Sequence, residues 1–164
     1  MKRRAVFLAV SLSVVLLMAG CAQRPTYSEV RQETLDALQQ VVDLLPEPGR
    51  IERTPEFEPY GCDDKLLLHS RGGGAFYTGQ WKVAVPDSFD VEAFLQQLPD
   101  LLGAGWTREE LGVPTQRAFV YLVRDSPRMT LSAEQSTLDE GKAVELLAIS
   151  RCGVEDTSSE SPPR

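Results

Sequence analysis

The hydrophobic pattern of the chain changes from helical to alternating spacing and back, and this order limits the fold more than any other feature. Apolar residues recur at helical spacing over 27–45 and again over 91–102. Between and after these stretches the pattern alternates with period two, as it does in strands. Two helices among consecutive strands with short turns predict an α+β fold, with both helices packed on one face of an antiparallel sheet of four to six strands.

The first predicted helix has recognisable ends. Thr26 and Glu29 form a Thr-x-x-Glu capping box at its start. Pro46 ends it, because proline lacks a backbone donor and restricts the preceding residue. We expect its apolar stripe to pack on the protein's own sheet; a helix that binds a partner is the alternative. The stripe consists of Tyr27, Val30, Thr34, Leu35, Leu38, Val41, Val42 and Leu45.

The second predicted helix follows Pro86, with Ser88 or Asp90 as its N-cap. Pro99 lies inside the apolar pattern and predicts a kink or break. Gly103 supplies the stop. The apolar stripe consists of Val91, Phe94, Leu95, Leu98, Leu101 and Leu102.

Six stretches are strand candidates, namely 65–70, 76–85, 106–111, 117–124, 129–135 and 144–152. Stretch 117–124 is apolar on both faces, which predicts a central strand. Stretch 129–135 alternates apolar and polar residues, which predicts a sheet with one solvated face. Residues 46–64 contain four prolines, many charges and no periodicity, so we expect a loop there.

The first residues have the organisation of a secretory signal. Lys2, Arg3 and Arg4 form a basic region, and an almost continuous apolar run extends from there to Ala19. The run is too short for a membrane-spanning helix, which needs about 20 predominantly apolar residues. We therefore expect export across the cytoplasmic membrane.

The residues that end this segment, Leu17-Met18-Ala19-Gly20-Cys21, resemble the lipobox of bacterial lipoproteins. The resemblance implies a diacylglycerol on the Cys21 thiol, cleavage before Cys21, and often a further fatty acid such as palmitate on the new N-terminus. An ordinary secretory signal is the alternative. The layout of the whole chain is similar to that of small actinobacterial cell-envelope lipoproteins of unknown function.

Lipidation at Cys21 would leave Cys62 and Cys152, for which only one pairing exists. The compartment implied by the lipobox is one where disulfides persist, so we expect a Cys62–Cys152 bond. Two unrelated thiols are the alternative.

The resulting domain prediction has four parts. Residues 1–20 are the signal peptide, 21–26 a lipidated tether, 27–153 a single α+β domain and 154–164 a disordered tail. Removing residues 1–20 takes away three basic residues and no acidic ones. The remaining 14 basic and 24 acidic residues give a net charge of −10. Such a chain is repelled by nucleic acid and by anionic lipid headgroups. Attachment to the lipid bilayer is therefore expected through acyl chains on Cys21 and not through a basic patch.

No arrangement of residues in the sequence points to a catalytic, metal or cofactor site. His69 is the only histidine, which excludes multi-histidine metal sites. The adjacent carboxylates Asp63-Asp64 and Glu109-Glu110 point to opposite faces of any strand. We expect a non-catalytic binding or interaction module of the cell membrane's outer side, with an envelope protein or a lipid as partner. The alternative is a lipid-handling protein or an enzyme whose site cannot be recognised from sequence.

Overall fold

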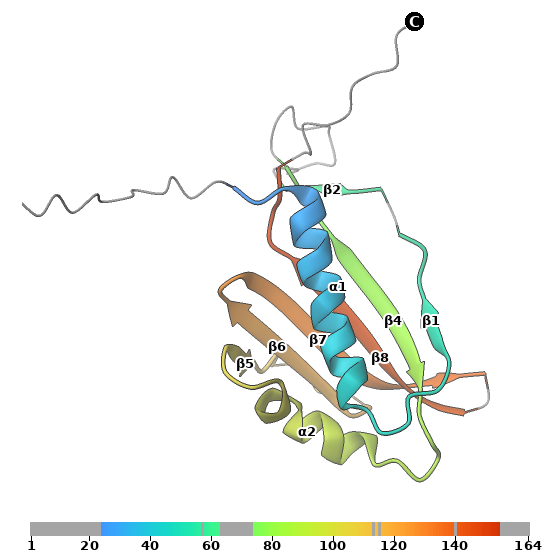
Figure 1. The fold of residues 1–164 in the computed structure, drawn as a ribbon. Coiled ribbons are helices and arrows are strands. Elements are labelled where there is room, and N and C mark those ends of the chain that lie inside the picture. The colour runs from blue at the N-terminus through green and yellow to red at the C-terminus, as the bar shows by residue number, and fades with distance from the viewer. Residues whose placement is uncertain are drawn as a thin grey trace, which may run out of the picture.

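The computed structural model describes residues 24–56, 58–62, 74–112, 114, 116–139 and 141–154. Cys21, the predicted strand over 65–70, His69 and residues 155–164 of the predicted tail lie outside these residues. Val154, predicted as the first residue of that tail, is instead hydrogen-bonded to the segment at the start of the first helix. Figure 1 shows the fold seen from the side of its helices.

The order of helices and strands along the chain largely follows the prediction from periodicity. In chain order they are α1 (Tyr27–Leu44), β1 (Ile51–Arg53), β2 (Tyr60–Gly61), β3 (Ala75–Phe76), β4 (Thr78–Ala84), α2 (Val91–Leu102), β5 (Trp106–Arg108), β6 (Phe119–Asp125), β7 (Arg128–Leu138) and β8 (Gly141–Ser150).

Within the described residues, six strands form one antiparallel sheet in the order β1-β4-β8-β7-β6-β5, and β2 and β3 form a separate pair. The predicted α+β class is therefore confirmed. Residues 117–124 were expected to form a central strand, and β6 is an inner strand of the sheet, paired with β7 on one side and with the short edge strand β5 on the other. The longest pairing in the sheet joins its two middle strands, β8 and β7, over ten residues.

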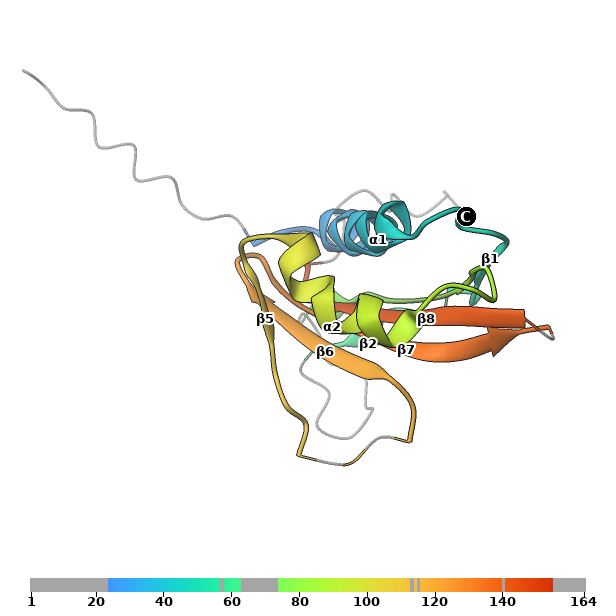
Figure 2. The same cartoon turned by 90° about the horizontal axis from the view of Figure 1, so that it is seen from below.

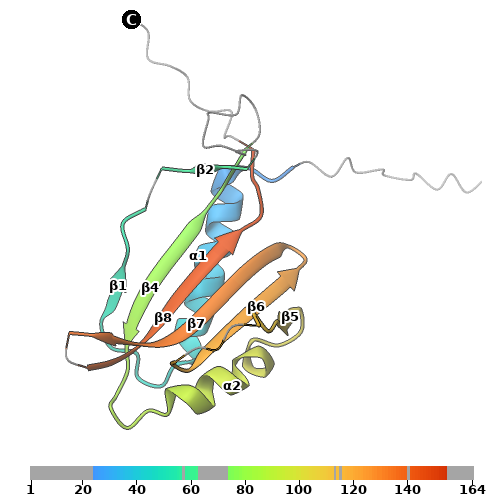
Figure 3. The same ribbon diagram turned by 180° about the vertical axis from the view of Figure 1, so that it is seen from behind.

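Both helices lie on one face of the sheet, as Figure 2 shows from below and Figure 3 from behind. Their apolar stripes and the facing side chains of the strands form one continuous core. Leu38, Leu98, Leu122 and Leu146 are fully buried in it. Gly79 permits the close approach of α1, since a Cβ atom there would lie 2.7 Å from Leu38 Cδ1.

The structure decides between the two N-cap candidates of α2, excludes a break at Pro99 and corrects the buried stripe. Asp90 is the N-cap, and its side chain accepts a hydrogen bond from the Ala93 N–H. The helix does not break at Pro99 but continues to Leu102. Leu101, predicted as part of the buried stripe, is 46% exposed because it lies on the outer side of the last turn.

Residues 46–64, predicted as a loop, contain the edge strand β1 and half of the β2–β3 pair. β1 pairs with β4, and Ile51 lies opposite Val83. The Cys62–Cys152 disulfide is present, with 6.1 Å between the Cα atoms. The long connection between α1 and β3 is thus held by backbone pairing as well as by the disulfide.

The face of the sheet opposite the helices is the mixed polar face predicted for the strand at 129–135. Thr130, Ser132 and Glu134 of β7 are partly exposed there, whereas Met129, Leu131 and Ala133 are buried under the helices. Among the described residues, no helix is long and apolar enough to cross a membrane.

Candidate functional site

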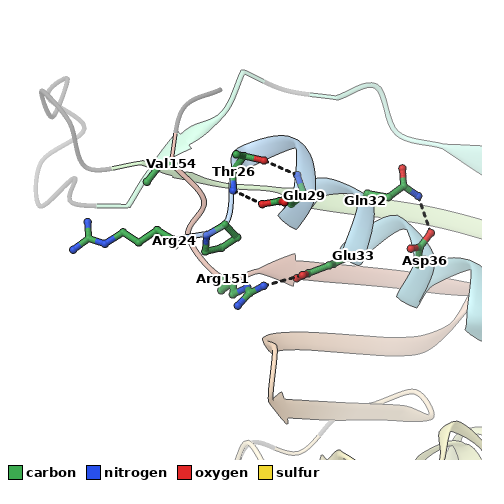
Figure 4. A pocket seen from close by; sticks show the side chains of 9 residues that line it. Arg24, Thr26, Glu29, Gln32, Glu33, Asp36, Arg151 and Val154 are labelled. Atoms are coloured by element: carbon green, nitrogen blue, oxygen red, sulfur yellow. Dashed lines mark hydrogen bonds and ion pairs between the residues drawn. The ribbon is translucent and has the colours of Figure 1, made fainter. Parts of the chain in front are cut away.

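A cleft of about 760 Å³ runs beside the first turns of α1, and we refer to it as the α1 cleft (Figure 4). Its size is within the range of small-molecule sites. Its walls are the polar side of α1, the segment before the helix, and the segment after β8. The lining residues are Arg24, Pro25, Thr26, Glu29, Gln32, Glu33, Asp36, Arg151 and Val154.

One wall of the α1 cleft is formed by the first turns of α1. Thr26 and Glu29 form the predicted capping box, in which the Thr26 N–H donates to Glu29 Oε2 at 2.7 Å and the Glu29 N–H donates to Thr26 Oγ1 at 3.2 Å. Residues three and four positions apart share a helix face, so Glu29, Gln32, Glu33 and Asp36 line the same side. Gln32 donates to Asp36 across one turn at 2.7 Å.

The opposite wall is held against the start of α1 by the backbone. The Tyr27 N–H donates to the Val154 carbonyl at 2.7 Å, and the Val154 N–H donates to the Pro25 carbonyl at 2.8 Å. Gly153 is required at the crossing, because a Cβ atom there would lie 2.5 Å from the Thr26 carbonyl oxygen. The adjacent Cys152 carries the disulfide, so this wall is anchored twice.

Glu33 and Arg151 bridge the two walls with an ion pair that has a single hydrogen bond. An Arg151 terminal nitrogen donates to Glu33 Oε1 at 2.8 Å. Glu33 Oε2 and Arg151 Nε are buried and have no partner in the described structure. An arginine–carboxylate pair commonly makes two parallel hydrogen bonds, so this pair is incompletely bonded.

Arg124 adds a second positive charge near Glu33. Its guanidinium lies 4.9 Å from the centre of the Trp106 ring, and its Nε donates to the Pro127 carbonyl at 3.2 Å. Burial lowers the pKa of Arg124, the Glu33 carboxylate opposes that change, and the Arg151 charge adds to it. Glu33 therefore lies in the field of two arginines but is hydrogen-bonded by one.

A second cleft, of about 360 Å³, adjoins the α1 cleft along α1 and is lined in part by a doubly hydrogen-bonded ion pair. Arg31 donates to both carboxylate oxygens of Glu56, through Nε at 3.0 Å and through a terminal nitrogen at 2.5 Å. The Tyr77 hydroxyl also donates to Glu56, at 3.2 Å. The Arg31 hydrogen bond lowers the pKa of Glu56, and burial together with Glu56 raises the pKa of Tyr77 to about 12.

A third polar cluster lies on the sheet face opposite the helices. Glu145 accepts hydrogen bonds from Gln80 and from Ser136, and forms an ion pair with Lys82 at 3.4 Å. Burial raises the pKa of Glu145, but these partners together lower it below its ordinary value. Glu134 lies directly opposite Glu145 in the register of β7 and β8, so two carboxylates do share a face. The sequence offered no sign of this pair, because it depends on the strand register.

Of the remaining candidates, Asp63, Asp64 and His69 lie outside the described residues. Glu110, of the Glu109-Glu110 pair, makes an exposed ion pair with Arg108 at 3.1 Å. Trp81 and Trp106 are buried in the core, whereas Tyr60 is 45% exposed and stacks on Phe76. Within the described ranges, no three histidine, cysteine or acidic residues gather where they could hold a metal ion.

The comparisons with known proteins give no relative: no family model, no curated protein and no solved structure matches this chain. The function must therefore be argued from the sequence and from the geometry of the clefts.

Proposed function

We propose that this protein is a lipoprotein of the cell envelope, anchored in the outer side of the cytoplasmic membrane through Cys21, and that it acts as a non-catalytic binding module. The proposed binding site is the α1 cleft. The observation that carries this proposal is the charged α1 cleft at the end of the fold where the chain continues toward Cys21.

The tether supports a site close to the bilayer. Arg24 lines the α1 cleft and is three positions after Cys21 in the sequence. Three residues span at most about 11 Å. Two or three acyl chains on Cys21 would anchor the protein stably, whereas a single chain binds only marginally. A lipid on Cys21 would thus bring the cleft to the headgroup layer.

The packing of the core favours a surface site over an internal one. The helices and the sheet meet through buried apolar side chains, among them Leu38, Leu95 and Leu131. The α1 cleft, by contrast, is open to solvent and lined by charged and amide side chains. Such a site fits recognition of a polar group better than storage of an acyl chain.

Lipid attachment is tested by replacing Cys21 in the full-length chain. We expect Cys21→Ser to abolish incorporation of a radiolabelled fatty acid, because the thioether cannot form without the thiol. The protein should then remain unprocessed or be released from the membrane. A Cys62→Ser variant is the matched control and should be labelled like the wild type. Labelling that survives the Cys21→Ser change would refute the anchor.

A further inference from the structure

The Glu33–Arg151 pair is easier to open than the other ion pair of α1. It makes one hydrogen bond and leaves a buried donor and a buried acceptor without partners. Such unpartnered buried groups carry a desolvation penalty that no hydrogen bond offsets. The Arg31–Glu56 pair makes two hydrogen bonds and a third through Tyr77. A ligand that enters between Glu33 and Arg151 therefore displaces few contacts and offers partners to the two unpartnered atoms.

Opening this pair places a condition on the charge of the ligand. An anion alone would bind Arg151 and leave the Glu33 carboxylate without its hydrogen-bonded partner. A cation alone would bind Glu33 and leave the Arg151 guanidinium unpaired. A partly buried charge without a partner is costly, so the favoured ligand carries both charges. A phosphate suits the guanidinium, and a primary ammonium group donates to a carboxylate.

The other charged residues of the α1 cleft also include both positive and negative side chains. Arg24 lies at its outer end, with its side chain extending away from the Glu33–Arg151 pair (Figure 4). Glu29 and Asp36 add negative charge along the helix, although Glu29 also serves the capping box and Asp36 also accepts from Gln32. The cleft thus offers both signs of charge over a short distance.

We propose that the α1 cleft binds the headgroup of a zwitterionic phospholipid, with the phosphate on Arg151 and the primary ammonium on Glu33. The proposal rests on the lipid anchor proposed above, since the tether is what brings the cleft to the headgroup layer. The ligand is then a lipid of the same bilayer in which Cys21 is held.

The test uses the unlipidated chain from Ala22 onward, which contains every described element, and measures co-flotation with vesicles. We expect binding to vesicles of phosphatidylethanolamine in phosphatidylcholine, because only the ethanolamine headgroup has N–H donors. Binding to phosphatidylcholine alone, or with phosphatidylglycerol, should be weaker. Soluble phosphoethanolamine should compete. Equal or stronger binding to the phosphatidylglycerol vesicles would overturn the proposal, and so would binding of phosphoethanolamine without binding to any vesicle.

Single substitutions locate the site. Arg151→Gln and Glu33→Gln should each weaken vesicle binding by about tenfold or more, the effect of losing one charged hydrogen bond. Arg151→Lys should retain binding, because a lysine still pairs with phosphate. Arg31→Gln is the matched control, since it breaks the other ion pair of α1 and should leave binding unchanged. Circular dichroism spectra verify the fold of each variant.

Two results would contradict the site: unchanged binding in both cleft variants, or an equal loss in Arg31→Gln. The assay contains no acyl chain on the protein, so a failure of lipid attachment at Cys21 cannot produce a negative result in it. The fatty-acid labelling of the full-length chain is equally independent of the cleft.

Discussion

At the scale of single residues, the two arginine–glutamate ion pairs of α1 differ in how completely they are hydrogen-bonded. Arg31 meets Glu56 with two hydrogen bonds, and the Tyr77 hydroxyl adds a third. Glu33 and Arg151 make one. The first pair fastens the segment after β1 to the helix, while the second leaves hydrogen-bonding capacity unused at the α1 cleft.

The titration of the Tyr77 phenol reports on the Arg31–Glu56 pair, because the Tyr77 hydroxyl is hydrogen-bonded to Glu56. The pKa of Tyr77 is raised to about 12 from an ordinary value of 10.0, by burial first and by Glu56 second. Because the raised value belongs to the folded state, the stability from the neutral phenol is fully present below about pH 10. It is lost as the pH rises toward 12.

Burial and Glu56 also raise the pKa of Tyr27. We therefore expect late phenolate formation in an ultraviolet titration, with its last step absent in Tyr77→Phe. That last step should move to lower pH in Glu56→Gln, where the neighbouring negative charge is gone. Tyr121→Phe keeps Tyr77 and serves as the control. A titration of Tyr77→Phe that ends as late as that of the wild type would contradict the assignment.

At the scale of elements, periodicity predicted both helices and most strands, because each has a buried and an exposed side. Strand β1 was missed: Ile51, Glu52 and Arg53 are too short a run to alternate, and they lie among prolines and charges. Apolar residues on both faces predicted that β6 lies inside the sheet, and it is paired on both sides, with β7 and with the edge strand β5. The same pattern overstates its burial: Val120 and Leu122 are buried, but the side chains on the other face are only partly buried.

Helix α2 carries a proline that tertiary packing tolerates. Pro99 cannot donate a backbone hydrogen bond, and a proline inside a helix costs about 3 kcal/mol relative to alanine. Part of this cost is offset because proline also restricts the unfolded chain. We expect Pro99→Ala to raise the free energy of unfolding by about 1–2 kcal/mol, measured by urea denaturation. Gln96→Ala, on the exposed side of the same helix, should change the free energy of unfolding little. A less stable Pro99→Ala variant would contradict the prediction and show that packing of the proline ring stabilises the fold.

At the scale of the whole molecule, the disulfide closes a long covalent loop, with a sequence separation of 90 between Cys62 and Cys152. Loop-closure entropy assigns about 4–5 kcal/mol to such a bond, and measured values are often lower. We expect Cys62→Ala/Cys152→Ala to lower the melting temperature by about 10 °C or more. Limited proteolysis should then cut the segment between β1 and β3 first. An unchanged melting temperature in the double variant would mean that backbone pairing alone holds this segment.

The disulfide was predictable from the cysteine count, whereas the α1 cleft was not. Glu33 and Arg151 are 118 residues apart in the sequence, and neither belongs to a recognisable motif. Glu33 occurs on the polar side of a helix, where charged residues are ordinary. Only the folded arrangement, which places the segment after β8 beside the start of α1, brings the two charges together.

That arrangement also determines how the molecule would bear tension. A pull on Arg24 reaches the backbone hydrogen bonds that join Pro25 and Tyr27 to Val154. Val154 is two residues beyond disulfide-bonded Cys152 and four beyond the end of β8, a strand in the middle of the sheet. Force from a membrane anchor would therefore be shared with the most deeply paired strand, and α1 would not be peeled away on its own.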